Sequence, residues 1–371
     1  TPNRVEFATG AETRTETDLR IPGRGLELAL ERTYRSRHVS DNPSTVLGFN
    51  WTFSYAGESL AANGSDLNVR TANGRTDTYV QTPPASGTFR GPAGFYDVIV
   101  DNGDSTYTRT TPDGSQFRYD SLLRLTARAD RFGNALTFRY DGSSGRLTRI
   151  TDTLGRAVDL EYDSNLHLLT RATDFAGRYV EYLYDGDSML TKVSTACGCG
   201  SAVTTSYTYS SGLGDPVLNR NLLTVTDGNG NTPLQFTYDP YDRVTREVQG
   251  TASQHWSIGY GGGEAPTTVY DRNGNRVDHY YSAAGNLTRR DTFDGPVLAH
   301  SETFLYSAGG ESTRIVRPAG DDIVRLYDAN GNMTYRAGSG GASESESLYY
   351  SSYETFNRLT RRVDGRLNAT T

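Results

Sequence analysis

The dipeptide Tyr-Asp, or its tyrosine alone, returns at a nearly fixed interval through most of this 371-residue chain. The stretch from Tyr140 to Asp163 begins and ends with it. The tyrosines that keep an interval of 21 or 22 residues, in two runs on either side of an interruption at about 195–220, are Tyr119, Tyr140, Tyr162, Tyr184, Tyr238, Tyr260 and Tyr281. A fixed period of this length is typical of a repeat architecture in which each unit stacks on its neighbours.

Apolar and polar residues alternate just before these tyrosines. Leu136 and Phe138 share the parity of Tyr140, whereas Arg139 has the opposite one. A period of two predicts a β-strand with one buried face. The residues predicted to form this buried face are Tyr119, Leu136, Phe138, Tyr140, Val158, Leu160, Tyr162, Val180, Tyr182, Tyr184, Leu234, Phe236, Tyr238, Trp256, Ile258, Tyr260 and Tyr281.

A second strand is predicted in each repeat, beginning with an aliphatic residue such as Leu147 in GRLTRITD. Leu147 and Ile150 are three positions apart, which breaks the alternation and indicates a β-bulge or a weakly specified strand end. Asp-x-x-Gly turns separate the strands, because Asp can bond its own backbone two residues on and Gly tolerates positive φ. The predicted turn glycines are Gly133, Gly155, Gly177, Gly274 and Gly331.

Composition agrees with many short strands joined by tight turns. The chain uses 40 Gly and 25 Tyr, and its hydrophobic fraction is only 35%. A single hairpin of this size is marginally stable, but stacked hairpins bury their tyrosine face collectively. The sequence therefore predicts an all-β protein built as one spiralling antiparallel sheet.

Three regions are expected along the chain. Residues 1–60 form an N-terminal region of short strands, 61–118 a set of bridging β-hairpins, and 119–371 the repeat spiral, interrupted at about 195–220 by a CGCG and Gly-rich loop. The chain opens at Thr1 without a Met, so a processed or trimmed product is expected.

The repeats and the N-terminal region together resemble a known family. The unit G-R-L-T-x-x-x-D-x-x-G-R-x-x-x-x-x-Y-D, matched at 145–163, resembles the YD repeats of bacterial Rhs proteins and is similar to those of animal teneurins. The ATG at 8–10, the run TDLRIPGRGLELALERTYRSR at 17–37 and LGFNWTFSYAGESL at 47–60 resemble the segment that precedes these repeats in bacterial members.

The resemblance covers nearly the whole chain. It implies a long β-sheet that spirals into an Rhs-type shell or solenoid. In bacterial Rhs and toxin-complex proteins such a shell encloses a C-terminal toxin, whereas in teneurins it supports adhesion. The P-x-x-x-x-D-P-x-G-L junction that precedes the toxin in toxin-bearing members does not occur in this sequence.

Charge and hydropathy narrow the candidate partners. The net charge is -7, and the basic residues, nearly all Arg, are dispersed among Asp and Glu. Nucleic-acid binding requires a clustered basic surface, so no nucleic-acid partner is expected. No apolar run approaches the roughly 18 residues of a membrane span, so membrane insertion is not expected either.

The two cysteines are the most conspicuous reactive residues. Cys197 and Cys199 lie two positions apart, a spacing that strains a disulfide, and two thiols without a nearby His do not complete a tetrahedral metal site. A loop with structural or free thiols is favoured, and an intermolecular disulfide or a metal pair are the alternatives.

Other motifs give little indication of catalysis or cofactor binding. The five histidines are scattered, and His279 has an inward strand parity that predicts packing. The D-x-N-G-N runs at Asp227, Asp271 and Asp328 resemble the start of a calcium loop, but they have no Glu at the twelfth position. Turns are favoured over weak calcium sites, and no cofactor and no enzymatic activity are expected.

These observations favour a non-catalytic protein, secreted or at the cell surface, with a structural or adhesive role. An open edge strand can recruit another chain, so head-to-tail assembly into a filament is the first hypothesis, with other cell-surface proteins or glycans as further partners. The alternative is a fragment of an Rhs toxin shell that encloses and delivers a C-terminal effector. A carbohydrate-active enzyme is the least favoured hypothesis.

Overall fold

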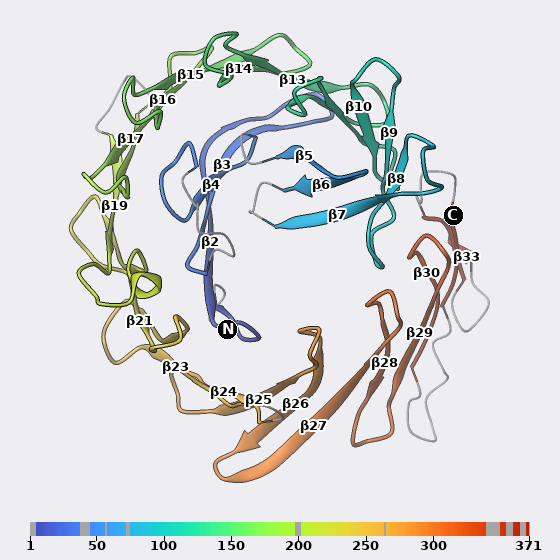
Figure 1. Cartoon of the computed structure of the whole chain (residues 1–371). Coiled ribbons are helices and arrows are strands. Elements are labelled where there is room, and N and C mark those ends of the chain that lie inside the picture. The colour runs from blue at the N-terminus through green and yellow to red at the C-terminus, as the bar shows by residue number, and fades with distance from the viewer. Residues whose placement is uncertain are drawn as a thin grey trace.

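The computed structural model consists of two antiparallel β-sheets, one lying inside the curve of the other (Figure 1). It describes residues 5–37, 45–55, 58–71, 75–196, 202–262, 265–338, 349–353, 359–363 and 369–370. Within these ranges the single helical element is a short 3-10 turn, η1 (Pro216–Leu218). The predicted all-β, spiralling antiparallel fold is confirmed.

The smaller sheet, here called the N-terminal sheet, has four strands in sequence order. They are β1 (Val5–Glu6), β2 (Ala11–Ile21), β3 (Leu28–Arg35) and β4 (Trp51–Phe53). Alternate residues of β3 are fully buried, as a strand with one core-facing side requires. Asp18 of β2 has no opposite residue on β3, because the register shifts between Thr17 and Leu19.

The larger sheet, here called the long sheet, runs from β5 to β33, and every strand pairs antiparallel with the next one in sequence. Its first strands are β5 (Ser59–Asn63), β6 (Asp66–Arg70), β7 (Thr76–Gln81), β8 (Thr88–Arg90), β9 (Val98–Asp101), β10 (Tyr107–Thr110), β11 (Gln116–Tyr119) and β12 (Leu125–Ala129). The predicted boundary between residues 60 and 61 thus falls two residues into β5.

The repeats supply the remaining strands. They are β13 (Ala135–Tyr140), β14 (Leu147–Thr151), β15 (Ala157–Tyr162), β16 (Leu169–Asp174), β17 (Tyr179–Tyr184), β18 (Leu190–Ala196), β19 (Val203–Tyr209), β20 (Leu222–Asp227), β21 (Leu234–Tyr238), β22 (Val244–Gln249), β23 (His255–Tyr260), β24 (Thr267–Tyr270), β25 (Arg276–Tyr281), β26 (Leu287–Asp294), β27 (Val297–Tyr306), β28 (Ser312–Val316), β29 (Ile323–Tyr327), β30 (Met333–Gly338), β31 (Tyr349–Tyr353), β32 (Leu359–Val363) and β33 (Ala369–Thr370).

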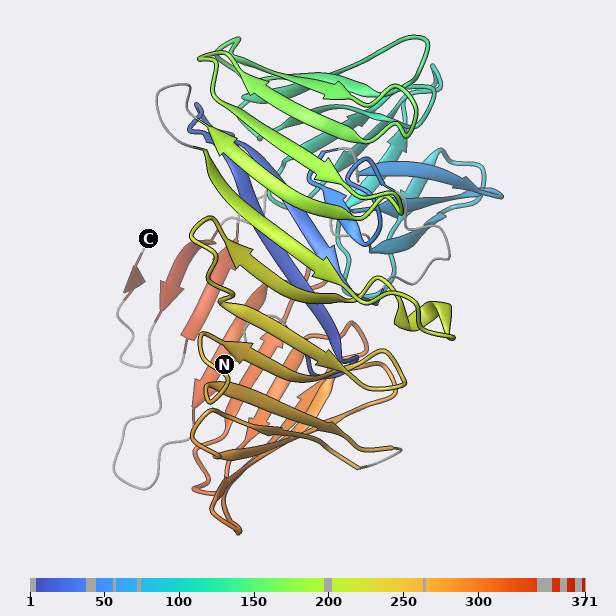
Figure 2. The ribbon, with the colours of Figure 1, turned by 90° about the vertical axis from the view of Figure 1, so that its left-hand side faces the viewer.

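The long sheet winds around the N-terminal sheet, as two perpendicular views show (Figures 1 and 2). Its first strand turns inward and is bonded back to the turn between β11 and β12. The Leu60 amide donates to the Leu123 carbonyl at 3.0 Å, and Ser59 forms an isolated antiparallel bridge with Arg124. The leading edge of the long sheet is therefore occupied at Ser59 and Leu60.

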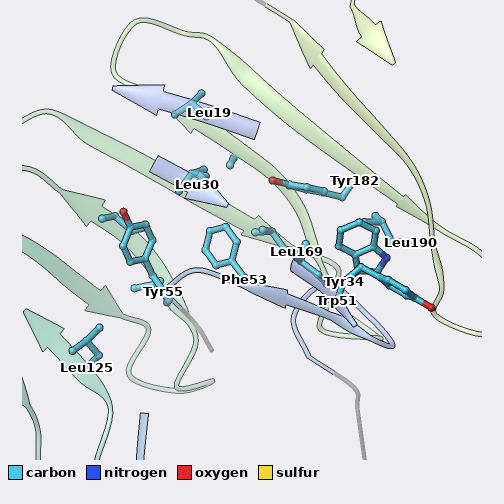
Figure 3. Close-up of a cluster of buried hydrophobic side chains, with 14 of the residues drawn as sticks. Leu19, Leu30, Tyr34, Trp51, Phe53, Tyr55, Leu125, Leu169, Tyr182 and Leu190 are labelled. Atoms are coloured by element: carbon cyan, nitrogen blue, oxygen red, sulfur yellow. The ribbon is translucent and has the colours of Figure 1, made fainter. Parts of the chain in front are cut away.

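One continuous hydrophobic core lies between the two sheets (Figure 3). Trp51 and Leu30 from the N-terminal sheet are fully buried together with Leu169 and Leu190 from the long sheet. On the opposite, convex face of the long sheet, residues such as Arg139 are exposed. The concave face of the repeats is thus apolar because the N-terminal sheet covers it.

Candidate functional site

The N-terminal sheet lies along the concave face of the long sheet, and backbone hydrogen bonds attach the N-terminal region there. The Leu169 amide donates to the Val46 carbonyl at 2.7 Å. Further along the spiral, the Val244 amide donates to the Gly10 carbonyl at 2.9 Å. These bonds fix the register between the N-terminal region and the repeats, since each one satisfies a backbone group that the long sheet leaves free.

A buried ion pair joins the two sheets near the middle of this interface. The Arg32 Nε lies 2.8 Å from Asp18 Oδ1, and both side chains are 4% exposed. Tyr182 of β17 donates its hydroxyl to Asp18 Oδ2 at 2.9 Å. Because Asp18 is the extra residue of a β-bulge, its side chain points towards the long sheet.

Aromatic rings enclose the guanidinium of this pair. The Cζ of Arg32 lies 4.7 Å from the ring centre of Trp51 and 5.3 Å from that of Tyr207. Burial raises the pKa of Asp18 above its usual value, although the charge of Arg32 opposes the shift. Burial alone would lower the pKa of Arg32, but the adjacent Asp18 carboxylate raises it, so Arg32 remains charged.

A second set of interfacial hydrogen bonds surrounds Tyr34 and Trp51. The Tyr34 hydroxyl accepts a hydrogen bond from the Leu222 amide at 2.8 Å and donates one to the Arg220 carbonyl at 3.2 Å. Trp51 Nε1 donates to the Tyr209 hydroxyl at 2.8 Å. Every polar atom named here has a partner, so burying these rings carries little desolvation penalty.

A further buried polar cluster lies within the first strands of the long sheet. Arg109 Nη2 lies 2.8 Å from Glu58, and Arg109 Nε lies 3.5 Å from Asp97. Tyr79 donates its hydroxyl to Asp97 at 2.7 Å. Burial raises the pKa of Glu58, and the charge of Arg109 opposes that shift. All of these groups bond to one another, which indicates a structural cluster.

The repeat tyrosines form a hydrogen bond that the sequence did not predict. Tyr162 donates its hydroxyl to the Leu147 carbonyl at 2.7 Å, fifteen positions earlier. The same contact, from a repeat tyrosine to the first residue of a preceding strand, is made by Tyr140 to Leu125, Tyr184 to Leu169, Tyr209 to Leu190, Tyr238 to Leu222, Tyr260 to Val244, Tyr306 to Leu287 and Tyr327 to Ser312.

A β-bulge is associated with this contact. Tyr140 pairs with Leu147 and Arg139 with Arg149, so Thr148 is the extra residue. The Thr148 hydroxyl donates to the Arg139 carbonyl at 3.2 Å. The bulge that the spacing of Leu147 and Ile150 indicated is confirmed, and it explains why Thr follows Leu in this unit.

The Asp-x-x-Gly turns are closed by a side-chain clasp. In the turn that begins at Asp152, Oδ1 accepts hydrogen bonds from the amides of Leu154 and Arg156, and Oδ2 accepts one from Arg156 Nε at 2.8 Å. The predicted turn glycines all have positive φ: Gly133, Gly155, Gly177, Gly274 and Gly331. The residue after each glycine, Arg or Asn, is a functional part of the turn that sequence reasoning missed.

The D-x-N-G-N segments have the same geometry. At Asp271, Oδ1 accepts from the amides of Asn273 and Asn275, and Oδ2 accepts from Asn275 Nδ2 at 2.8 Å. The segments at Asp227 and Asp328 repeat it. Both carboxylate oxygens are used within the turn, which favours the turn interpretation over calcium binding. Within the described residues, no group of three or more His, Cys, Asp or Glu could hold a metal ion.

The predicted buried-face residues lie on the concave side. Among them, Val158, Val180 and Tyr182 are at most 1% exposed, whereas Trp256 and the tyrosines from Tyr140 onward that end strands are half-buried. His279 packs against Phe7 with ring centres 5.0 Å apart. Cys197 and Cys199 lie outside the described residues. No helix in the described part of the chain is long and apolar enough to cross a membrane.

The concave face of the long sheet becomes polar beyond the part that the N-terminal sheet covers. Thr267, whose hydroxyl donates to the Phe7 carbonyl, lies opposite His279, and His279 lies opposite Arg290. Arg290 in turn lies opposite Glu302 and forms an ion pair with it. Opposite residues of an antiparallel pair share a face, so a polar row follows the contact between Phe7 and Thr267.

Comparison with known proteins agrees with the sequence motifs. The family model "Domain of unknown function (DUF6531)" matches residues 2–79, and the RHS Repeat model matches residues 119–157 and 140–179. Over 134 residues the chain is 28% identical to tRNA nuclease WapA of Bacillus subtilis and to tRNA3(Ser)-specific nuclease WapA of Bacillus spizizenii. The match covers 36% of this chain and 6% of each WapA protein.

Solved structures of similar shape include TcdB2-TccC3 and the Photorhabdus luminescens Tc holotoxin pore. Both have 12% sequence identity and a TM-score of 0.48, and the match covers 95% of this chain. The chain spans 23% of the first and 22% of the second.

A long sheet of Tyr-Asp repeats, wound around a small N-terminal sheet, defines a YD-repeat protein. The matches to the repeats and to the N-terminal region place the chain in that class by sequence as well. Its repeats match the RHS Repeat model, so the class that these observations support is that of the Rhs/YD-repeat proteins.

Proposed function

We propose that this chain is a non-catalytic wall segment of a β-shell, and that the N-terminal sheet sets the curvature of the wall. The main supporting observation is the buried contact of Asp18 and Arg32 with Tyr182. A repeat sheet contacts only its neighbours and can bend over a range of angles. An N-terminal region anchored at Val46, Tyr34 and Gly10 to successive strands would select one of these angles.

The polar row beyond the N-terminal sheet supports an enclosed, water-filled space on the concave side. Arg290 and His300 are each 45% exposed there, whereas the concave positions under the N-terminal sheet are apolar and buried. If this part of the concave face were packed in a hydrophobic core, the side chains of Arg290 and His300 would lose their hydration, at a high cost in free energy. In a longer polypeptide, the enclosed cargo would be an effector enzyme, by analogy with the relative named tRNA nuclease.

Head-to-tail assembly into a surface filament is the competing hypothesis. It requires an open, complementary edge at each end of the sheet. The edge of β5 is occupied at Ser59 and Leu60 by the turn that contains Leu123. This favours the shell over the filament.

Sedimentation velocity and negative-stain microscopy of the purified chain test the proposal. We expect discrete curved particles whose sedimentation coefficient is constant as the protein concentration increases. Filaments that lengthen with concentration would contradict the shell and support the head-to-tail hypothesis. Substitution of Leu60 by Pro, which removes the amide that bonds Leu123, would then be expected to promote association by freeing the edge.

A further inference from the structure

Three consecutive turns on one rim of the long sheet carry exposed apolar residues. They are Phe132, Leu154 and Phe175, with 74%, 57% and 56% of their surfaces exposed, and they are here called the apolar rim. The turns join β12 to β13, β14 to β15 and β16 to β17, so the meander places all of them at the same end of the strands. A row of large exposed apolar side chains often marks an interaction surface.

The turns do not need these residues for their own stability. The clasp uses an Asp, the positive-φ Gly and the residue that follows it. At two equivalent turns on the same rim, the position of Phe132 and Leu154 is held by Asn229 and Asn273, and the same clasp forms. The apolar side chains therefore serve a purpose other than closing the turns.

The surroundings of the apolar rim are basic. The Asp152 and Asp174 carboxylates lie almost completely buried beneath it. The guanidinium of Arg131 lies 4.8 Å from the ring centre of Phe132, and that of Arg156 lies 5.5 Å from the ring centre of Phe175. The turns at Asp152 and Asp174 thus hide their negative charges, and arginine lies beside the apolar tips.

The N-terminal sheet adds to this surface. Arg156 Nη2 donates to the Pro22 carbonyl at 2.5 Å, so the turn between β2 and β3 lies beside the rim. Gly25 approaches so closely that a Cβ there would overlap the side chain of Asn134. Arg24, in the same turn, is exposed and adds another positive charge.

The spacing of the tips indicates the shape of the partner. Neighbouring turns on one rim are two strands apart, or about 9.6 Å. Residues one heptad apart on an α-helix are about 10.5 Å apart along its axis, on the same side of the helix. We propose that the apolar rim binds an amphipathic α-helix of a partner protein, with heptad-spaced apolar residues flanked by Asp and Glu.

A membrane surface is less well matched to these side chains. A guanidinium lies over one face of Phe132 and over one face of Phe175, and more than half of each side chain remains exposed for packing. A helix with acidic flanks would pack against the ring edges and pair with Arg24 and Arg131 at the same time.

Binding of a synthetic peptide tests the proposal. The probe is a fluorescein-labelled helix of about three heptads, with Leu at the heptad core positions and Glu at the flanking ones. In fluorescence anisotropy we expect it to bind the full chain at least about tenfold more tightly than the same peptide with Lys flanks. Equal affinity for both peptides would overturn the charge argument.

Matched variants locate the site. The triple change Phe132→Asn, Leu154→Asn and Phe175→Asn removes the three apolar side chains, and at Phe132 and Leu154 it copies the Asn of the equivalent turns. We expect it to weaken binding of the Glu peptide by about tenfold or more. The control, Leu122→Asn with Leu166→Asn on the opposite rim, should leave binding unchanged. Unchanged binding in the triple variant would overturn the proposal.

Two further measurements keep the test decisive. If the triple variant does not fold, Arg24→Glu with Arg131→Glu should still weaken binding of the Glu peptide and improve binding of the Lys peptide. The wild-type protein is also tested with vesicles of phosphatidylcholine and phosphatidylglycerol and for dimerisation. If it binds the vesicles or dimerises through the apolar rim but does not bind the Glu peptide, the proposal that an α-helix is the partner would be contradicted.

Discussion

Tyr182 donates a hydrogen bond to Asp18 across 2.9 Å, joining the middle of the repeat array to a residue 164 positions earlier in the chain. Arg32 completes the contact from the N-terminal sheet. The two sheets are therefore joined by a buried ion pair of the N-terminal sheet and a neutral tyrosine hydroxyl of the long sheet. Removing one member of the ion pair alone leaves the other charge buried without its partner, which leads to the first prediction.

Replacing Arg32 by Met should strongly destabilise the protein. The change leaves the Asp18 carboxylate buried without its cation, and loss of one partner of a buried pair costs about 3–5 kcal/mol. Urea unfolding followed by circular dichroism measures the difference. The double variant Asp18→Leu with Arg32→Met should recover much of the loss, and a double variant as unstable as Arg32→Met would contradict this explanation.

Removing one repeat-tyrosine hydroxyl should produce a smaller, local effect. Tyr162→Phe leaves the Leu147 carbonyl without its donor, for an expected cost of about 1–2 kcal/mol. Hydrogen exchange should show faster opening around β14 and β15. Tyr241→Phe is the control, because that ring is 72% exposed, and it should be neutral. Equal effects of the two changes would refute a structural role for the Tyr162 hydroxyl.

The stability cost of replacing a turn glycine by alanine should depend on the backbone φ of that glycine. Gly155 has φ +78 and open space around it, so Gly155→Ala should cost about 1 kcal/mol through backbone strain alone. Gly142 also has open space but no positive φ, which makes Gly142→Ala a matched control with little expected effect. Thermal unfolding of both variants measures the difference in stability. An unchanged unfolding temperature for Gly155→Ala would be inconsistent with the clasp geometry.

The clasps should make the protein sensitive to acid. Burial alone would raise the pKa of Asp152, but the Arg156 guanidinium and backbone amides hold it below its usual value. A carboxyl group with a lowered folded-state pKa stabilises the fold above its unfolded value of about 3.9, and this contribution disappears as the pH falls through the folded pKa. The pKa values of Asp239, Asp271 and Asp328 are lowered as well.

Burial instead raises the pKa values of Asp18, Glu58 and Asp242, and these groups oppose the trend. The clasps are more numerous, so the free energy of unfolding should decrease below about pH 4. Asp152→Asn should reduce the slope of that decrease in urea titrations at successive pH values. An unchanged slope would show that the clasp does not contribute.

Much of the repeat architecture could be predicted because its causes are local. The alternation of Leu136, Phe138 and Tyr140 follows from the period of a strand, and the Asp-x-x-Gly turns follow from the chemistry of Asp and Gly. The clasp needed one more residue of the same motif, the Arg or Asn after the Gly. The interval of fifteen residues between Leu147 and Tyr162 recurs in the two neighbouring repeats and was a visible signal for their bond.

The contact between the two sheets could not be predicted in this way. Asp18 lies in an ordinary strand by sequence, and nothing near it indicates a partner at Tyr182. Its orientation depends on a bulge and on the course of the spiral, which brings together residues that are far apart in sequence. The exposed apolar residues Phe132, Leu154 and Phe175 likewise could not be recognised as one surface from the sequence, because only the order of the strands places them on the same rim.

The central claim, that the N-terminal sheet is the core of the repeat spiral, can be tested with a single-tryptophan protein. The chain has two Trp, and Trp256→Phe leaves only Trp51, which is completely buried between the sheets. In a urea titration, Trp51 fluorescence reports release of the N-terminal sheet and far-UV circular dichroism reports loss of the long sheet. The structure predicts that the two transitions coincide, as one cooperative unit requires. Exposure of Trp51 at lower urea, with the long sheet still intact, would contradict it.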